Sequence, residues 1–237
     1  MSKDEQDPVS IVLVHGAFVD GSGWQAVHNL LTDRGFEVLV VQHPTITLAD
    51  DVAATSRVIA MASNAVVLVG HSYGGAVITE AGDDPRISSL VYLAAFVPDA
   101  GESLAALSEK PLAPGETTAP LLPPQDGFLM VDPARFSEAF AADVDPDVTR
   151  FMAAAQVPWG LEAVTTPIRR VAWRTRPVHY LVASDDRMIP PSAQRHMASR
   201  AGASVLEIAS SHAIMLSHPV EVADFIEAAA RSASPSA

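Results

Sequence analysis

Short runs of apolar, mostly β-branched residues alternate along this chain with segments whose apolar residues recur at helical spacing. The runs carry no regular apolar–polar alternation, which is typical of strands buried on both faces of a parallel sheet. Six strands are expected, at 9–14, 36–41, 65–69, 87–96, 178–183 and 204–208. Helices are expected at 24–33, from Thr47 to about 63, after the strand at 65–69 as far as 82, and at 191–200 and 219–231. This alternation predicts right-handed βαβ crossovers and a mostly parallel six-stranded sheet with helices on both faces.

The strand at 65–69 ends in the sequence GHSYG at 70–74, and small residues compatible with a helix follow. A G-x-S-x-G pattern at a sharp strand-to-helix turn predicts a nucleophile elbow, in which a strained backbone lifts the serine hydroxyl clear of the sheet edge. The helix that follows directs its N-terminal N–H groups toward the same point, where they favour a negative oxygen. Ser72 is therefore the candidate nucleophile.

The pattern changes between Pro98 and Pro177. Eleven of the 18 prolines lie there, without any β-branched run and with amphipathic pieces around 133–142 and 148–156. The segment is too apolar for a plain linker and too broken to extend the sheet. We therefore expect a helical lid insertion at 98–176, folded over the elbow, between a first core part at 1–97 and a second at 177–237.

A serine becomes a nucleophile at neutral pH with a base beside it, and an imidazole base needs a carboxylate to hold its tautomer and stabilise its cation. In a parallel sheet these partners come from loops at the carboxyl ends of later strands. Of the eight histidines, only His212 lies in such a loop in the chain order serine, acid, histidine. The acid is Asp185 or Asp186, which are neighbours after the strand at 178–183, and Asp186 is favoured.

Charge and composition narrow the function. The chain has 15 Lys and Arg against 28 Asp and Glu, a formal net charge of −13, and such a surface argues against nucleic-acid or membrane binding. With no cysteine, thiol catalysis, disulfides and thiolate metal sites are excluded. Residues 1–8 are polar and the apolar run at 90–97 is too short to span a bilayer, so we expect a cytoplasmic protein; a homodimer is compatible with these features.

These motifs resemble the α/β-hydrolase family, and more closely its compact six-stranded branch of plant methylesterases, hydroxynitrile lyases and bacterial esterases. The resemblance covers nearly the whole chain. It rests on HGA at 15–17, Gly-Trp at 23–24, GHSYGG at 70–75, the spacing Asp186-x-x-x-Pro190, and His212 before the last helix. It implies an α/β-hydrolase fold, Asp186 as the triad acid, and an oxyanion hole formed by the backbone N–H groups of Ala17 and Tyr73.

The same resemblance separates reaction types. Hydroxynitrile lyases of this branch tend to carry a threonine at the position of Gly16 and a lysine directly after the catalytic histidine, where its charge would stabilise cyanide. This chain has Gly16 and Ala213 at those positions, which favours an esterase. A lyase-like or other non-hydrolytic enzyme on the same fold, a non-catalytic small-molecule receptor, and an interaction protein with a coincidental elbow are the alternatives.

The sequence therefore predicts a serine hydrolase that cleaves small to medium uncharged carboxylic esters through an acyl-enzyme. Ser72, His212 and Asp186 would form the triad, and no cofactor or metal is required for this chemistry. The expected partner is a small-molecule ester. Apolar residues of the lid and of the loops near the elbow are expected to bind it: Phe18, Trp24, Phe128, Met152, Trp159 and Met215.

Overall fold

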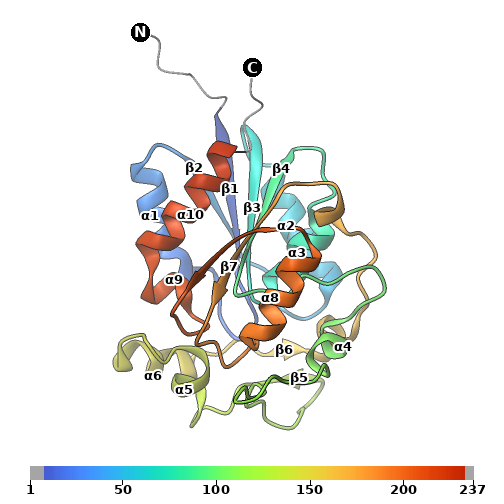
Figure 1. Cartoon of the computed structure of the whole chain (residues 1–237), viewed down its shortest axis with the longest axis vertical. Coiled ribbons are helices and arrows are strands. Elements are labelled where there is room, and N and C mark those ends of the chain that lie inside the picture. Colours follow the sequence, from blue (N-terminus) through green and yellow to red (C-terminus); the bar gives the residue numbers. More distant parts are fainter. Residues whose placement is uncertain (1–7, 233–237) are drawn as a thin grey trace.

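The structure, a computed structural model, describes residues 8–232. Its centre is a six-stranded sheet in the order β2-β1-β3-β4-β7-β8, with every neighbouring pair parallel (Figure 1). The strands are β1 (Val9–Val14), β2 (Glu37–Val41), β3 (Ala65–His71), β4 (Ile87–Leu93), β7 (Val178–Ala183) and β8 (Ser204–Ile208). All six expected strands are present. The chain runs outward from β1 to β2 and then returns to β3, so the loops after β1 and β3 diverge at a switch point where ligands bind in open α/β sheets.

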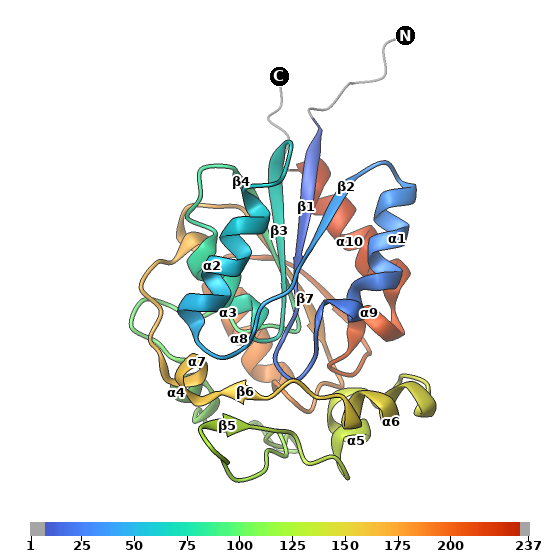
Figure 2. The same cartoon turned by 180° about the vertical axis from the view of Figure 1, so that it is seen from behind.

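Helices cover both faces of the sheet (Figures 1 and 2). One face carries α1 (Gln25–Asp33), preceded by the short turn η1 (Gly21–Trp24), together with α9 (Ile214–Ser217) and α10 (Pro219–Ser232); the other carries α2 (Leu48–Ile59), α3 (Gly74–Ala81) and α8 (Pro191–Arg200). Alternate residues of the central strands feed two separate cores. In β1, Ile11 and Leu13 belong to the core under α1 and α10, whereas Val12 and Val14 belong to the core under α2 and α3. The four central strands, β1, β3, β4 and β7, are buried on both faces, which explains why they lack polar alternation, whereas the edge strand β8 is largely exposed.

The segment between β4 and β7 lies across the carboxyl ends of the strands, at the lower edge of Figure 2. It contains α4 (Leu104–Ser108), β5 (Phe128–Leu129), α5 (Phe136–Phe140), α6 (Pro146–Ala154), β6 (Trp159–Gly160), α7 (Leu161–Thr165) and the turn η2 (Ala172–Arg174). Residues 98–176 are called the lid below. The amphipathic pieces are helical as expected, at α5 and α6. The antiparallel pair of β5 and β6 is an addition that the sequence does not predict, because strands of two residues have no periodicity to read.

Two expected elements end early. The strand that begins at Ile87 ends at Leu93, because Ala94 has a φ of +43° and leaves the β region. The helix that opens at Thr47 ends at Ile59; its first turn is capped by Thr47 Oγ1, which accepts the Asp50 N–H at 3.0 Å. Within residues 8–232, no helix combines the length and apolar character needed to cross a bilayer.

Candidate active site

Ser72 lies at the tip of the turn between β3 and α3. Its φ of +56° is in the left-handed region, where a residue with a side chain is strained. A Cβ at Gly70 would approach the Gly74 carbonyl oxygen to 2.6 Å, and a Cβ at Gly74 would approach the His15 carbonyl oxygen to 2.7 Å. The turn therefore requires glycine on both sides of the serine, as the elbow pattern predicts.

The structure brings Ser72, His212 and Asp186 into one hydrogen-bonded row. Ser72 Oγ is 2.8 Å from His212 Nε2, and His212 Nδ1 is 2.7 Å from Asp186 Oδ2. All three residues are buried, with Ser72 the most accessible at 8%. Asp185 is exposed, so of the two neighbouring acids the structure places Asp186 against the imidazole.

The carboxylate of Asp186 is fixed by three further donors. Its Oδ1 accepts the backbone N–H groups of Met188 at 2.7 Å and Ile189 at 3.0 Å. Its Oδ2 accepts the side-chain amide of Gln194 at 2.7 Å. Gln194 also donates to the Ile189 carbonyl at 2.8 Å and accepts from the Ala183 N–H at 3.1 Å. Sequence reasoning misses Gln194; the available signal is a polar residue on the buried face of α8.

The backbone that carries His212 is held from two sides. His71 Nε2 donates to the His212 carbonyl at 2.8 Å, and the N–H of Ala213 donates to the Phe140 carbonyl in the lid at 2.9 Å. The Phe140 ring also packs edge-on against the imidazole, with 4.8 Å between ring centroids. Burial, together with the nearby His212, lowers the pKa of His71 well below its usual value, so His71 stays neutral. The lid thus contacts the imidazole directly.

The two backbone groups expected to form an oxyanion hole belong to segments that adjoin Ser72. Ala17 follows β1, Tyr73 follows Ser72, and both are buried. A Cβ at Gly16 would lie 2.7 Å from Ser72 Cβ, so the loop after β1 presses closely on the serine. Among the described residues, no carbonyl or side chain accepts a hydrogen bond from the N–H of Ala17 or Tyr73, which leaves both groups available to a ligand.

The residues predicted to bind substrate lie in different places. Phe18 and Trp159 pack edge to face at 5.6 Å between centroids. Trp24, Met152 and Met215 line a small cavity of about 20 Å³, which has room for about one water molecule. Phe128 is paired in β5 with Gly160 and is not among the residues that line either cavity described here.

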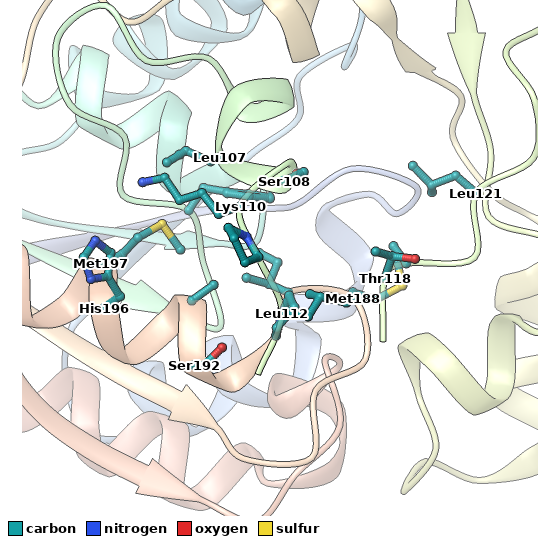
Figure 3. Close-up of a pocket in the computed structure, with 16 residues that line it drawn as sticks. Leu107, Ser108, Lys110, Leu112, Thr118, Leu121, Met188, Ser192, His196 and Met197 are labelled. Carbon is teal, nitrogen blue, oxygen red and sulfur yellow. The ribbon is translucent and has the colours of Figure 1, made fainter. Parts of the chain in front are cut away.

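A larger cavity of about 400 Å³ lies between the lid and α8 (Figure 3). Its walls include Leu107, Leu112 and Leu121 of the lid together with Met188 and Met197, all labelled in Figure 3. Two of the residues that line it, Phe96 and Ile189, are hydrogen-bonded to members of the triad. The N–H of Phe96 donates to the Ser72 carbonyl at 3.1 Å, and Ile189 is one of the donors to Asp186.

None of the six residues predicted to bind substrate lines this larger cavity. The sequence selects large apolar residues of the lid and of the loops near the elbow, but which of them face this cavity depends on the path of the lid. That path follows from turns and short pairings, such as β5 with β6, that carry no sequence periodicity. The lining comes instead from Phe96, from the first part of the lid, from the loop that follows Asp186 and from α8.

Comparisons with known proteins agree with this architecture. The model of the alpha/beta hydrolase family matches residues 11–225. The alpha/beta hydrolase nvfD of Aspergillus novofumigatus is 27% identical over 94% of this chain and 97% of its own. A carbendazim hydrolyzing esterase of Nocardioides is 40% identical over 44% of this chain and 49% of its own. The crystal structure of a pyrethroid hydrolase from Sphingobium faniae superposes with a TM-score of 0.79 at 25% identity, over 95% of this chain and 97% of its own. The chain therefore belongs to the alpha/beta hydrolase family.

Proposed function

We propose that this protein hydrolyses uncharged carboxylic esters through an acyl-enzyme on Ser72. The observation that carries the proposal is the pair of hydrogen bonds, 2.8 and 2.7 Å long, that join Ser72 to His212 and His212 to Asp186. Serine, imidazole and carboxylate in this order supply a nucleophile, a general base and a group that stabilises the imidazolium.

In the proposed reaction, His212 Nε2 takes the proton of Ser72 as Oγ attacks the ester carbonyl carbon. The carbonyl electron pair moves to oxygen, and the N–H groups of Ala17 and Tyr73 bind the resulting oxyanion. When the tetrahedral intermediate collapses, the bond to the alkoxy group breaks and His212 protonates the leaving alcohol. A water molecule, deprotonated by His212, then attacks the acyl carbon. The bond from that carbon to Ser72 Oγ breaks, His212 returns the proton to Oγ, and the carboxylic acid is released.

The larger cavity supports an apolar acyl or alcohol group as one half of the substrate. Its volume of about 400 Å³ is within the range of pockets that bury small organic molecules. Leucine and methionine side chains cover much of its wall. Ser72, Asp186 and His212 do not line it, but two residues that do, Phe96 and Ile189, donate their backbone N–H groups to Ser72 and Asp186. Two relatives support hydrolysis as the reaction, since one is named a carbendazim hydrolyzing esterase and the other a pyrethroid hydrolase.

The test is turnover of p-nitrophenyl acetate, butyrate and octanoate by the wild type, Ser72→Ala and His212→Ala. We expect wild-type turnover, a loss of about 10⁴-fold or more in kcat in both variants, and a higher kcat/KM for the longer esters because the cavity accepts the chain. Release of cyanide from cyanohydrins without ester turnover would instead support a lyase. Tight binding of an ester that is never cleaved would support a receptor.

A further inference from the structure

A buried carboxylate that the proposed mechanism does not use lies behind the elbow. Asp51, in the first turn of α2, is 0% exposed. Its Oδ2 accepts the phenol hydroxyl of Tyr73 at 2.5 Å, and its Oδ1 accepts the backbone N–H of Thr45 at 2.9 Å. Burial and the adjacent charge of Asp51 raise the pKa of Tyr73 well above its usual value, so the phenol remains protonated and donates.

Tyr73 connects Asp51 to one half of the proposed oxyanion hole. Its backbone N–H is one of the two proposed donors, while its side chain is tethered to the carboxylate. The ring is 1% exposed and also packs against Trp159 of the lid, 5.2 Å between centroids. Because ring and N–H belong to one residue at the start of α3, anchoring the ring limits rotation of the N–H.

His43 lies between Asp51 and the loop after β1. Its Nε2 donates to the His15 carbonyl at 3.0 Å, and its Nδ1 lies 3.2 Å from Asp51 Oδ1 without a hydrogen bond between them. The His43 backbone N–H donates to His15 Nε2 at 3.3 Å, and the two rings stack with 3.8 Å between centroids and 3° between planes. The two histidines therefore form one rigid stack beside the carboxylate.

His15 in turn orients the peptide that bears the second donor. Its Nδ1 donates to the Gly16 carbonyl at 2.8 Å. The Gly16 carbonyl and the Ala17 N–H belong to one planar peptide unit, so holding the carbonyl fixes the direction of the N–H. Burial, together with His43, lowers the pKa of His15 to about 4, which keeps the ring neutral and leaves its Nε2 free to accept from His43.

We infer that Asp51 is a positioning residue that aligns one donor of the oxyanion hole, the N–H of Tyr73, through the Tyr73 phenol; the stack of His43 and His15 beside it holds the other donor, the N–H of Ala17. The inference rests on the proposed function, because the alignment matters only if Ser72 forms a tetrahedral intermediate. Asp51 itself touches no reacting atom. Its effect is therefore on the transition state and not on substrate binding.

The test compares Asp51→Asn and Tyr73→Phe with a matched control, Tyr92→Phe. Tyr92 is also fully buried, and its hydroxyl pairs with Thr79 at 2.9 Å outside this cluster. Tyr73→Phe removes only the hydrogen bond from the phenol to Asp51 and leaves the hydrogen bond between Asp51 and Thr45 in place. The measurements are kcat and KM for p-nitrophenyl butyrate and the inhibition constant of a trifluoromethyl ketone, whose serine adduct carries an oxyanion.

We expect Asp51→Asn and Tyr73→Phe to lower kcat about tenfold or more, less than the loss of a whole donor, and to weaken the inhibitor by a similar factor. KM should stay within about twofold, and the double variant should lose less than the product of the single losses because both changes break one linkage. Rates are expressed per active site, titrated to completion with a fluorophosphonate, so that unfolded protein does not count.

If both variants match Tyr92→Phe in kcat, or lose kcat while the inhibitor binds as before, the inference on Asp51 is overturned. Those results would leave the proposed function standing, since the wild type would still turn over and Ser72→Ala would not. A wild type without turnover or labelling would overturn the proposed function and this inference together.

Discussion

Gln194 donates its side-chain amide to Asp186 at 2.7 Å, on the same carboxylate oxygen that faces His212. The amide is 0% exposed and also serves the backbone of Ala183 and Ile189. It therefore locks the carboxylate to the end of β7 and to the loop that follows.

Replacing Gln194 with leucine should reduce both stability and rate. The backbone groups of Ala183 and Ile189 lose a buried partner, which costs about 1–3 kcal/mol of unfolding free energy. Asp186 loses one of its donors, and we expect kcat to fall about tenfold because the imidazole is less firmly oriented. Urea denaturation and steady-state kinetics measure the two effects; a variant with wild-type kcat would show that the backbone donors alone orient Asp186.

The neighbouring acids Asp185 and Asp186 form a matched pair for testing the triad. Asp186→Asn should lower kcat by about 10⁴-fold, because the amide favours the wrong imidazole tautomer. Asp185→Asn makes the same chemical change on an exposed side chain, and we expect kcat within about twofold of the wild type, as for most surface changes. Steady-state kinetics on p-nitrophenyl butyrate checks both, and equal losses in the two variants would refute the assignment.

Close packing at the elbow predicts a large difference between two glycines. A Cβ at Gly75 would lie 2.2 Å from the Phe96 carbonyl oxygen, whereas a Cβ at Gly23 would meet nothing within 4 Å. We expect Gly75→Ala to lower the unfolding free energy by about 1–3 kcal/mol or more through overpacking. Gly23→Ala should stay within about 0.5 kcal/mol of the wild type. Chemical denaturation of the two variants is the measurement, and equal stabilities would contradict the observed packing.

Glu102 gives the fold an acid-sensitive contact at the base of the lid. Its carboxylate accepts two hydrogen bonds from Arg200, both 2.8 Å long, and one from the Asp99 N–H at 2.8 Å. Partial burial opposes ionisation, but these donors, with Lys110 3.6 Å away, outweigh it and lower the pKa of Glu102 to about 2. Because the folded pKa lies below the unfolded value of 4.5, the stabilisation is complete above pH 4.5 and is lost as the pH falls toward 2.

Glu102→Gln should therefore lower the unfolding free energy at pH 7 by about 1–3 kcal/mol. The difference in unfolding free energy between the wild type and Glu102→Gln should become progressively smaller below pH 4.5. Urea denaturation at pH 7, 5 and 3 measures it, with Glu109→Gln, an exposed glutamate on the same segment, as the control. A gap that is the same at every pH would mean that the contact acts through packing and not through charge.

The sequence predicts the sheet well because each strand is a compact apolar run between turns, and buried parallel strands need no other signal. The elbow is predictable for a related reason. Glycine is required at 70 and 74 because an added Cβ would lie only 2.6 and 2.7 Å from backbone carbonyl oxygens, so the local sequence reflects the geometry of the turn.

The lid and the support behind the site are harder to predict, because they depend on contacts between distant segments. Trp24 and Phe128 are large apolar residues that the sequence predicts to bind substrate, and neither of them lines the larger cavity. Asp51 does leave a signal: helical spacing from Leu48 to Thr55 places it on the buried face of α2, where a carboxylate requires a partner. Only the structure shows that Tyr73 is that partner.

Covalent labelling of Ser72 tests the central claim most directly. The wild type and Ser72→Ala are incubated with a fluorophosphonate, and intact mass and peptide mapping locate the adduct. The account predicts one adduct on the wild type, at Ser72, and none on Ser72→Ala, because His212 and the two N–H groups activate only that hydroxyl. An unlabelled wild type, or equal labelling of both proteins, would contradict the assignment of Ser72 as the nucleophile.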